Sequence, residues 1–253
     1  MSRYAKGDLS FLTAETNLIN SVLAGSHRLT PEEREHIVVL YDGGICYLDH
    51  YLGLLFEKLK ALKVYDNTLI IITSDHGEAF GEHNSMEHGL TLYEEVLRVP
   101  LIIKYPSAYL QRAVVEKRAS LVDLMPTILS FLGSPIPSGI DGEALGNSSH
   151  PVIAELMMGI FKKRNKGVRD LRAIYQGKEK YIWATDSLNE LYDLEKDLGE
   201  LQNLIAKFPR RAQALDKTLM QWVASIKPLK TKGEKVKISR STEEKLRALG
   251  YLR

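Results

Sequence analysis

The stretch from Thr68 to Gly89, TLIIITSDHGEAFGEHNSMEHG, decides the fold of this chain. It opens with an unbroken apolar run rich in β-branched side chains, which predicts a short strand buried on both faces, as in parallel sheets. A second run of the same kind, VPLIIKY, spans Val99 to Tyr105. The polar segment between the two runs therefore follows the C-terminal end of a predicted central strand, where open α/β sheets bind their ligands.

This polar segment carries the residue types of a site for a hard divalent cation, which prefers oxygen ligands and accepts an imidazole. Asp75 and His76 leave the end of the predicted strand, and Gly77 allows a sharp turn after them. Because consecutive strand residues point to opposite faces, both side chains can bind one ion only where the backbone has left the strand. The plainer alternative is that they only cap a turn, but His83 and His88 on the same loop favour a functional site.

Other classes of function find less support in the sequence. The segment HNSMEH has neither the HExxH nor the HxxEH spacing, which disfavours a zinc-protease site. Lys and Arg total 34 against 32 Asp and Glu, so no global charge marks a nucleic-acid binder. The single cysteine, Cys46, excludes an internal disulfide framework. No run approaches the roughly 20 apolar residues of a membrane span.

A long amphipathic helix is predicted upstream, over TPEEREHIVVLYDGGICYLDHYLGLLFEKLKALK. Thr30 and Glu33 form a capping box, and Pro31 suits the first turn. Apolar residues at steps of three and four define one face of the helix, here called the apolar stripe. The apolar stripe comprises Ile37, Tyr41, Ile45, Leu48, Leu52, Leu55, Leu59 and Leu62. Cys46 lies on the same side and is predicted to be a core residue.

Downstream, the pattern predicts a short helix, a loop and then strands. The helix is LVDLMPTILSFLG, with Asp123 as its cap, and a loop rich in Pro, Gly and Ser follows it. VIAEL, LRAIYQ and EKYIWAT are predicted strands, and Gly177 and Lys178 form a tight turn between the last two. A helix from about Arg210 to Ser225 comes next. The basic segment after it is predicted to be a solvated linker rather than a polyanion-binding patch.

Several linked segments of the chain resemble, in order, the C-terminal part of the sulfatase family, within the alkaline phosphatase-like superfamily. These segments are YDGGICYLDHYLGLLFEKLK, DNTLIIITSDHGEAFGEH, HGLTLYEEVLRVPLIIKYP, SLVDLMPTILSFLG, ELYDLEKDLGELQNL and LRALGYL. The resemblance implies an α/β fold: a mixed, mostly parallel sheet flanked by helices, plus a small C-terminal antiparallel sheet with a packed helix. Residues 1–150 would belong to the catalytic α/β domain, 151–226 to a small α+β subdomain, and 227–253 to a basic linker and terminal helix.

The resemblance also implies roles for individual residues. Asp75 and His76 match the family's second pair of metal ligands, which complete a site for one divalent cation, usually calcium. His88 falls where relatives carry a lysine or histidine that contacts the sulfate or the leaving-group oxygen. His83 is expected to support the site from behind the ligands or to contact the substrate. Glu94 and Arg98 are expected to form a buried pair that holds this loop against the core.

Two parts of the family's active site do not occur in these 253 residues. The family takes its other metal ligands from an N-terminal Asp pair, and its nucleophile is a formylglycine made within a C/S-x-P-x-R motif. Cys46 is followed by YLDHY and does not fit that motif. We therefore expect a fragment, inactive alone, of a metal-dependent hydrolase that acts on a sulfate ester of a small molecule or glycan. Strands missing from its sheet would leave an exposed edge or apolar face, which invites self-association.

Two alternatives remain open at this point. One is a hydrolase of the same superfamily that acts on phosphodiesters or phosphonates, or a phosphoglycerol transferase. The nucleophile would separate some of these enzymes, because a C/S-x-P-x-R motif indicates a sulfatase or a phosphonate hydrolase, whereas an ordinary Thr or Ser indicates phosphoryl transfer. The other alternative is a non-catalytic module that acts through its surface.

Overall fold

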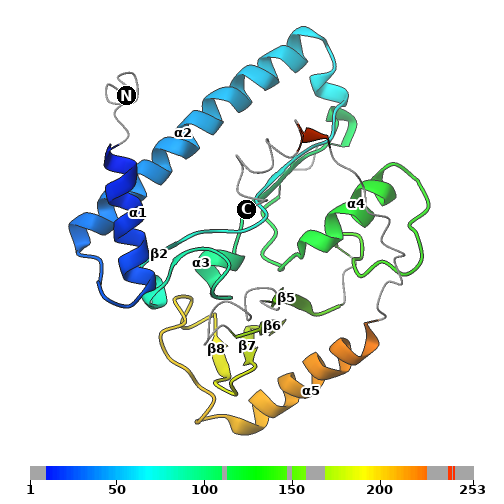
Figure 1. Ribbon diagram of the computed structural model, residues 1–253. Coiled ribbons are helices and arrows are strands. Elements are labelled where there is room, and N and C mark those ends of the chain that lie inside the picture. Colours follow the sequence, from blue (N-terminus) through cyan, green and yellow to red (C-terminus); the bar gives the residue numbers. More distant parts are fainter. Residues whose placement is uncertain are drawn as a thin grey trace. The chain divides into compact units, whose positions relative to one another are not determined.

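The computed structural model describes residues 10–109, 113–146, 150–157, 169–226, 239, 240 and 242. By its contacts the chain divides into two units, Met1–Lys217 and Thr218–Arg253. The elements below belong to the first unit, apart from the last turns of α5 (Pro209–Ser225) (Figure 1). The predicted linker and terminal helix at 227–253 lie outside the described residues, save for three positions, and the predicted boundary at residue 150 stays a prediction.

The predicted long helix is α2 (Pro31–Ala61), which follows α1 (Ser10–Leu23) in the chain (Figure 1). Its start has the predicted capping box: Glu33 N–H donates to Thr30 Oγ1 at 3.2 Å, and Thr30 N–H donates to Glu33 Oε2 at 2.8 Å. His27 Nε2 lies 2.8 Å from the same Glu33 oxygen. The N-terminus of α2 is therefore determined by local side chains. No described helix has the length and hydropathy of a membrane span.

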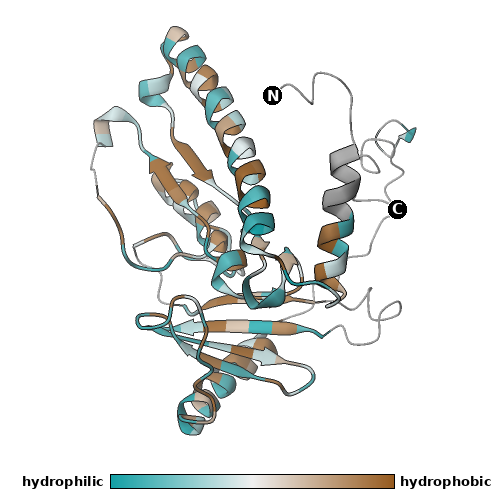
Figure 2. Ribbon diagram, turned by 90° about the vertical axis from the view of Figure 1, so that its left-hand side faces the viewer, coloured by the Kyte–Doolittle hydropathy of each residue, from teal (hydrophilic) through white to brown (hydrophobic). Residues whose placement is uncertain are grey.

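The apolar stripe of α2 is exposed along most of its length. No residue of α2 is buried, and the exposed fractions on the stripe reach 50% at Ile45 and 58% at Leu48. Figure 2 shows hydrophobic positions, in brown, alternating with hydrophilic ones, in teal, along the long helix. Cys46 is also exposed, so the prediction of a core position for it was wrong. The periodicity located an apolar face correctly, but the described residues cover little of it: Tyr41 packs on Phe80 with ring centroids 5.1 Å apart, while Ile45, Leu48 and Leu55 are exposed.

The two predicted strands are β1 (Ile70–Thr73) and β4 (Leu101–Lys104), which pair antiparallel with Ile71 opposite Ile103. The sequence had placed both inside a mostly parallel sheet, but every pairing among the described residues is antiparallel. Ile102 is 58% exposed because β1 and β4 form a two-stranded sheet in the described chain, which leaves much of each strand uncovered.

The loop from β1 to β4 contains short elements of its own. These are β2 (Ala79–Phe80), the 3₁₀ turn η3 (Glu82–Asn84), β3 (Met86–Glu87) and the one-turn helix α3 (Glu94–Leu97). After β4 come the short turns η4 (Ser107–Tyr109) and η5 (Leu121–Asp123), and then α4 (Leu124–Phe131). Asp123 lies at the predicted cap position before α4, but its side chain makes no cap hydrogen bond to that helix. It is buried and accepts instead from the backbone N–H groups of Ser120 and Glu143.

The predicted small antiparallel sheet is confirmed. It has the order β5 (Val152–Leu156), β6 (Leu171–Gln176), β7 (Glu179–Ala184) and β8 (Glu190–Asp193), with Gly177 at φ +58° in the turn between β6 and β7. The start of α5 joins β7 through a hydrogen bond of 2.9 Å from the Tyr181 hydroxyl to Asp216. The core on this sheet includes Leu92, from the loop before α3. The loop that follows β1 is therefore packed on the small sheet.

The exposed apolar stripe predicts self-association of the isolated chain, because an apolar face of this kind is normally covered by another surface. The mass measured by light scattering should rise with protein concentration. Replacing Ile45 and Leu48 together by glutamate should shift it toward the monomer, whereas replacing the polar surface residues Glu57 and Lys58 by alanine should not. A constant monomer mass for the wild-type chain at high concentration would contradict this prediction.

Candidate metal site

The candidate site lies on the turn after β1, where the backbone has left the strand as predicted. The Asp75 side chain is 87% exposed and that of His76 is 39% exposed. Asp75 Oδ1 lies 3.8 Å from His76 Nε2, so an oxygen and a nitrogen ligand face one another across a short gap. The His76 backbone N–H donates to the same carboxylate oxygen at 3.1 Å. The turn therefore presents both side chains to one side.

Hydrogen bonding determines which nitrogen of His76 carries its proton. Nδ1 lies 2.8 Å from the carbonyl oxygen of Gly77, and a carbonyl can only accept, so Nδ1 is the donor. The lone pair of a neutral ring is then on Nε2, which is the nitrogen nearest Asp75. Histidine ligands of metals commonly donate their other N–H to a carbonyl in this way. A hydrogen bond from its own backbone N–H, together with His76, lowers the pKa of the Asp75 carboxyl. This donor set suits a divalent cation.

Gly77 is required by the close approach of α3. Its N–H donates to Val96 O at 2.7 Å, and a Cβ at this position would lie 2.1 Å from the carbonyl oxygen of Glu95. Its φ lies outside the left-handed region, so the glycine is not needed for the sharp turn that the sequence suggested. The position of α3 therefore sets the position of the turn that carries Asp75 and His76.

The structure places His88 beside His76. The two rings stack with centroids 3.8 Å apart and an interplanar angle of 25°. His88 Nδ1 lies 3.3 Å from each carboxylate oxygen of Glu78, and the His88 side chain is 48% exposed. Three of the four predicted site residues, Asp75, His76 and His88, are therefore brought together. Glu78, whose role no sequence pattern indicated, orients the His88 ring.

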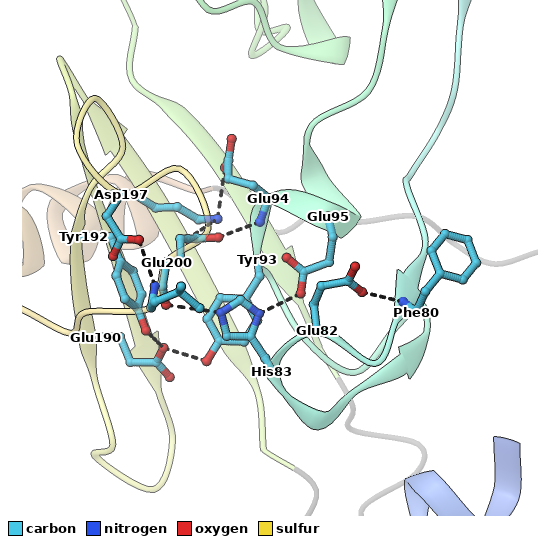
Figure 3. Close-up of polar contacts among 12 residues, drawn as sticks. Phe80, Glu82, His83, Tyr93, Glu94, Glu95, Glu190, Tyr192, Asp197 and Glu200 are labelled. Carbon is cyan, nitrogen blue, oxygen red and sulfur yellow. Dashed lines mark hydrogen bonds and ion pairs between the residues drawn. The ribbon is translucent and has the colours of Figure 1, made fainter. Parts of the chain in front are cut away.

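His83, the fourth predicted site residue, is directed elsewhere. Its Nδ1 lies 2.8 Å from Glu95 Oε1, its Nε2 lies 3.2 Å from the carbonyl oxygen of Glu200, and its ring stacks on Tyr93 (Figure 3). Both partners accept only, so the ring donates from both nitrogens as an imidazolium. Burial opposes the charged form, but the hydrogen bonds to Glu95 and to the Glu200 carbonyl outweigh it and raise the pKa of His83. His83 therefore contacts α3 and the loop after β8.

The carboxylate of Glu94 has a partner that the sequence did not suggest. Lys180 Nζ lies 3.1 Å from Glu94 Oε1 and 2.8 Å from Glu200 Oε1, and the Lys180 side chain has 0% exposure. The second contact is an ion pair rather than a hydrogen bond, since Glu200 Oε1 has no hydrogen-bond partner among the described residues. The predicted pair of Glu94 with Arg98 was wrong, because the backbone of Arg98 is already extended at the end of α3 and its side chain is exposed.

Asp75 and His76 by themselves do not make a complete metal site. Within the described ranges, no group of three or more His, Cys, Asp or Glu side chains is placed to hold a metal ion. These two side chains could offer two ligands, and a hard cation needs several more from water, substrate or other protein groups. His88, stacked on His76, adds a proton-carrying group at the same place.

The charged state of His83 predicts a pH dependence of stability. Its pKa is raised by folding, so its contribution is complete below the unfolded value and is lost as pH rises through the folded value. His83→Asn keeps a residue that tolerates the left-handed backbone at φ +50°. In urea unfolding without metal, this variant should lose more stability at about pH 6 than at about pH 8. The exposed His50→Asn serves as control, and an equal loss at both pH values in His83→Asn would contradict the charged state.

Comparison with protein families gives two matches along the chain. Residues 5–134 match the model of the sulfatase family. Residues 81–228 match a second model, described as the C-terminal part of N-sulphoglucosamine sulphohydrolase. The turn with Asp75 and His76 lies within the first match, and His88 lies within both.

Individual relatives agree with these matches. Arylsulfatase K of Bos taurus is 32% identical over 210 residues, which covers 76% of this chain and 37% of the relative. An arylsulfatase of Clostridium perfringens is 32% identical over 187 residues, which covers 72% of this chain and 39% of the relative. The chain thus spans less than half the length of the curated relatives it matches.

A solved structure matches the fold. The phosphonate monoester hydrolase of Agrobacterium radiobacter superposes with a TM-score of 0.66 at 28% identity, and the match covers 77% of this chain and 42% of that one. This similarity confirms the alkaline phosphatase-like α/β fold that the sequence predicted. Because family models match more than half of the chain, in the order that the motifs predicted, the chain belongs to the sulfatase family.

Proposed function

We propose that this chain carries one half of the active site of a metal-dependent hydrolase of sulfate esters, and that Asp75 and His76 bind a calcium ion there. The observation that carries the proposal is the pairing of Asp75 Oδ1 with His76 Nε2 at 3.8 Å, with His76 Nδ1 held by the Gly77 carbonyl. A carboxylate and a lone-pair nitrogen on one exposed turn are suitable ligands for a divalent cation. When bound, the cation would supply positive charge for the nucleophile and the sulfate oxygens.

His88 is proposed as the group that assists the leaving-group oxygen. Glu78 accepts from its Nδ1, which orients the ring and leaves Nε2 as the atom that exchanges a proton. The ring stacks on His76 at 3.8 Å, so it lies beside the metal ligands where charge develops during ester cleavage. His83 has a different role in this proposal: it holds α3 through Glu95 and does not touch the substrate.

The remaining parts of the site are proposed to lie outside this chain. No C/S-x-P-x-R motif occurs in its 253 residues, so it contains no site for the formylglycine nucleophile expected from the family resemblance. A sulfated sugar as the substrate class is supported by the second family match, described as N-sulphoglucosamine sulphohydrolase, although that name places the sulfo group on nitrogen rather than in an ester. The ion would be shared between Asp75, His76 and ligands supplied by the missing portion.

A phosphonate monoester hydrolase is the second candidate function. It is favoured by the similarity to the Agrobacterium radiobacter enzyme of that name, at 28% identity over 77% of this chain. A bound cation and a histidine beside it would serve a phosphonate as well as a sulfate ester, because both carry negatively charged non-bridging oxygens. Activity of the full-length protein on an aryl sulfate and on an aryl phosphonate, compared side by side, separates the two.

Calcium should stabilise the isolated chain, because an ion that binds only the folded state shifts unfolding by mass action. When the free calcium concentration is a hundred times the dissociation constant, the free energy of unfolding rises by about 2.7 kcal/mol. Thermal unfolding with and without calcium measures it. Asp75→Ala should abolish the gain, and Asp66→Ala, an exposed carboxylate before β1, should keep it. No gain in the wild-type chain would contradict the metal site and favour a non-catalytic module.

The isolated chain should show no turnover of a chromogenic aryl sulfate above background, with or without calcium, because the proposed nucleophile is absent from it. The assay uses the purified chain and an active arylsulfatase as positive control. Turnover that disappears in the His76→Ala variant would contradict the proposal that this chain holds only half of the site.

A further inference from the structure

Lys180 occupies an unusual position for a lysine. It is the second residue of β7, its side chain has 0% exposure, and its ammonium contacts Glu94 on α3 and Glu200 on the loop after β8. A buried ammonium is tolerated only where carboxylates and hydrogen bonds compensate its lost hydration. Removing one partner of such a group is strongly destabilising, since it leaves an uncompensated buried charge. The three segments are therefore held together at this point.

The same residues determine the position of α3. Glu200 Oε2 accepts from the Glu94 backbone N–H at 2.6 Å, which satisfies a free N–H at the start of the helix. The Tyr175 hydroxyl donates to Glu94 Oε1 at 2.6 Å. A helix of four residues, Glu94–Leu97, has too few internal hydrogen bonds to be stable alone. Its position is thus set by groups on the small sheet and on the loop after β8.

A second connection fastens α3 to the same loop. His83 donates to Glu95 Oε1 at 2.8 Å and to the Glu200 carbonyl oxygen at 3.2 Å (Figure 3). Glu200 thereby binds the site loop with both its side chain and its backbone. Its own backbone has φ +52°, a conformation that persists only where surrounding contacts enforce it. Both connections end on α3, against which Gly77 packs with no room for a Cβ.

From this chain of contacts we infer that Lys180, with Glu94 and Glu200, is a positioning residue for the metal ligands Asp75 and His76. The small sheet fixes α3 through the buried ion pairs, α3 fixes Gly77 through the Val96 carbonyl, and Gly77 holds His76 Nδ1. An effect of Lys180 on metal binding rests on the proposed function. The mechanical coupling from Lys180 to Gly77 rests only on the contacts described above.

Hydrogen exchange of the Gly77 amide without metal tests the coupling. Lys180→Met removes the charge while keeping an unbranched apolar chain, and Lys180→Arg keeps the charge. The control is Lys178→Met, on the same hairpin, whose ammonium is 46% exposed and pairs with Glu195. Lys180→Met should speed exchange at Gly77 and in α3 more than in β6 and β7, and Lys180→Arg should exchange more slowly than Lys180→Met. Equal acceleration at all these amides, or none at Gly77, would overturn the inference.

Calcium affinity, measured by titration calorimetry, tests the consequence. Loss of a residue that orients metal ligands typically lowers affinity by about 10- to 100-fold, so Lys180→Met should do so and Lys178→Met should not. Where Lys180→Met fails to fold, Glu200→Gln serves, because it keeps the size of the side chain while removing its charge. If the wild-type chain does not bind calcium, the proposed function is contradicted. The coupling is still supported in that case if Lys180→Met speeds hydrogen exchange at Gly77. Calcium binding that Lys180→Met or Glu200→Gln leaves unchanged overturns the positioning role.

Discussion

One buried ammonium group connects three segments of this structure that are separate in sequence. Lys180 lies between Glu94 and Glu200 without exposed surface. Burial of two carboxylates with one ammonium leaves excess negative charge, and burial raises the pKa of Glu200 even though Lys180 opposes it. A pair of this kind adds little to stability compared with apolar packing, but it strongly disfavours any arrangement that separates its members. It therefore specifies where the loop after β1 docks.

In the loop after β1, the residues that hold α3 in place differ from the residues of the candidate site. Residues that hold α3 are largely buried, whereas the side chains of Asp75, His76 and His88 are partly or mostly exposed. The Gly77 carbonyl is the link between the two groups, because it fixes the His76 tautomer while Gly77 packs on α3. Ligands on a short exposed turn hold their geometry only if the backbone beneath them is rigid. We infer that this rigidity comes from the small sheet, through the contacts of Lys180 with Glu94 and of Gly77 with α3.

Local patterns in the sequence predicted local structure well. The capping box at Thr30 located the start of α2, and the position of Asp75 and His76 after an apolar run located the candidate site. Contacts between residues far apart in the sequence could not be predicted. The partner of Glu94 lies 86 residues downstream, and no periodicity links the two. The exposure of Cys46 was missed for a related reason, since a helical pattern shows which face is apolar but not what covers it.

The central claim is that His76 carries its proton on Nδ1 and offers the Nε2 lone pair, beside Asp75, to a calcium ion. Two-dimensional NMR of the imidazole ¹⁵N nuclei reports the protonation state of each ring nitrogen directly. The account predicts that His76 at neutral pH shows a protonated Nδ1 and an unprotonated Nε2, and that calcium shifts the Nε2 signal in the wild type but not in Asp75→Ala. A proton on Nε2 of the metal-free chain, or a His76 ring that does not respond to calcium, would contradict it.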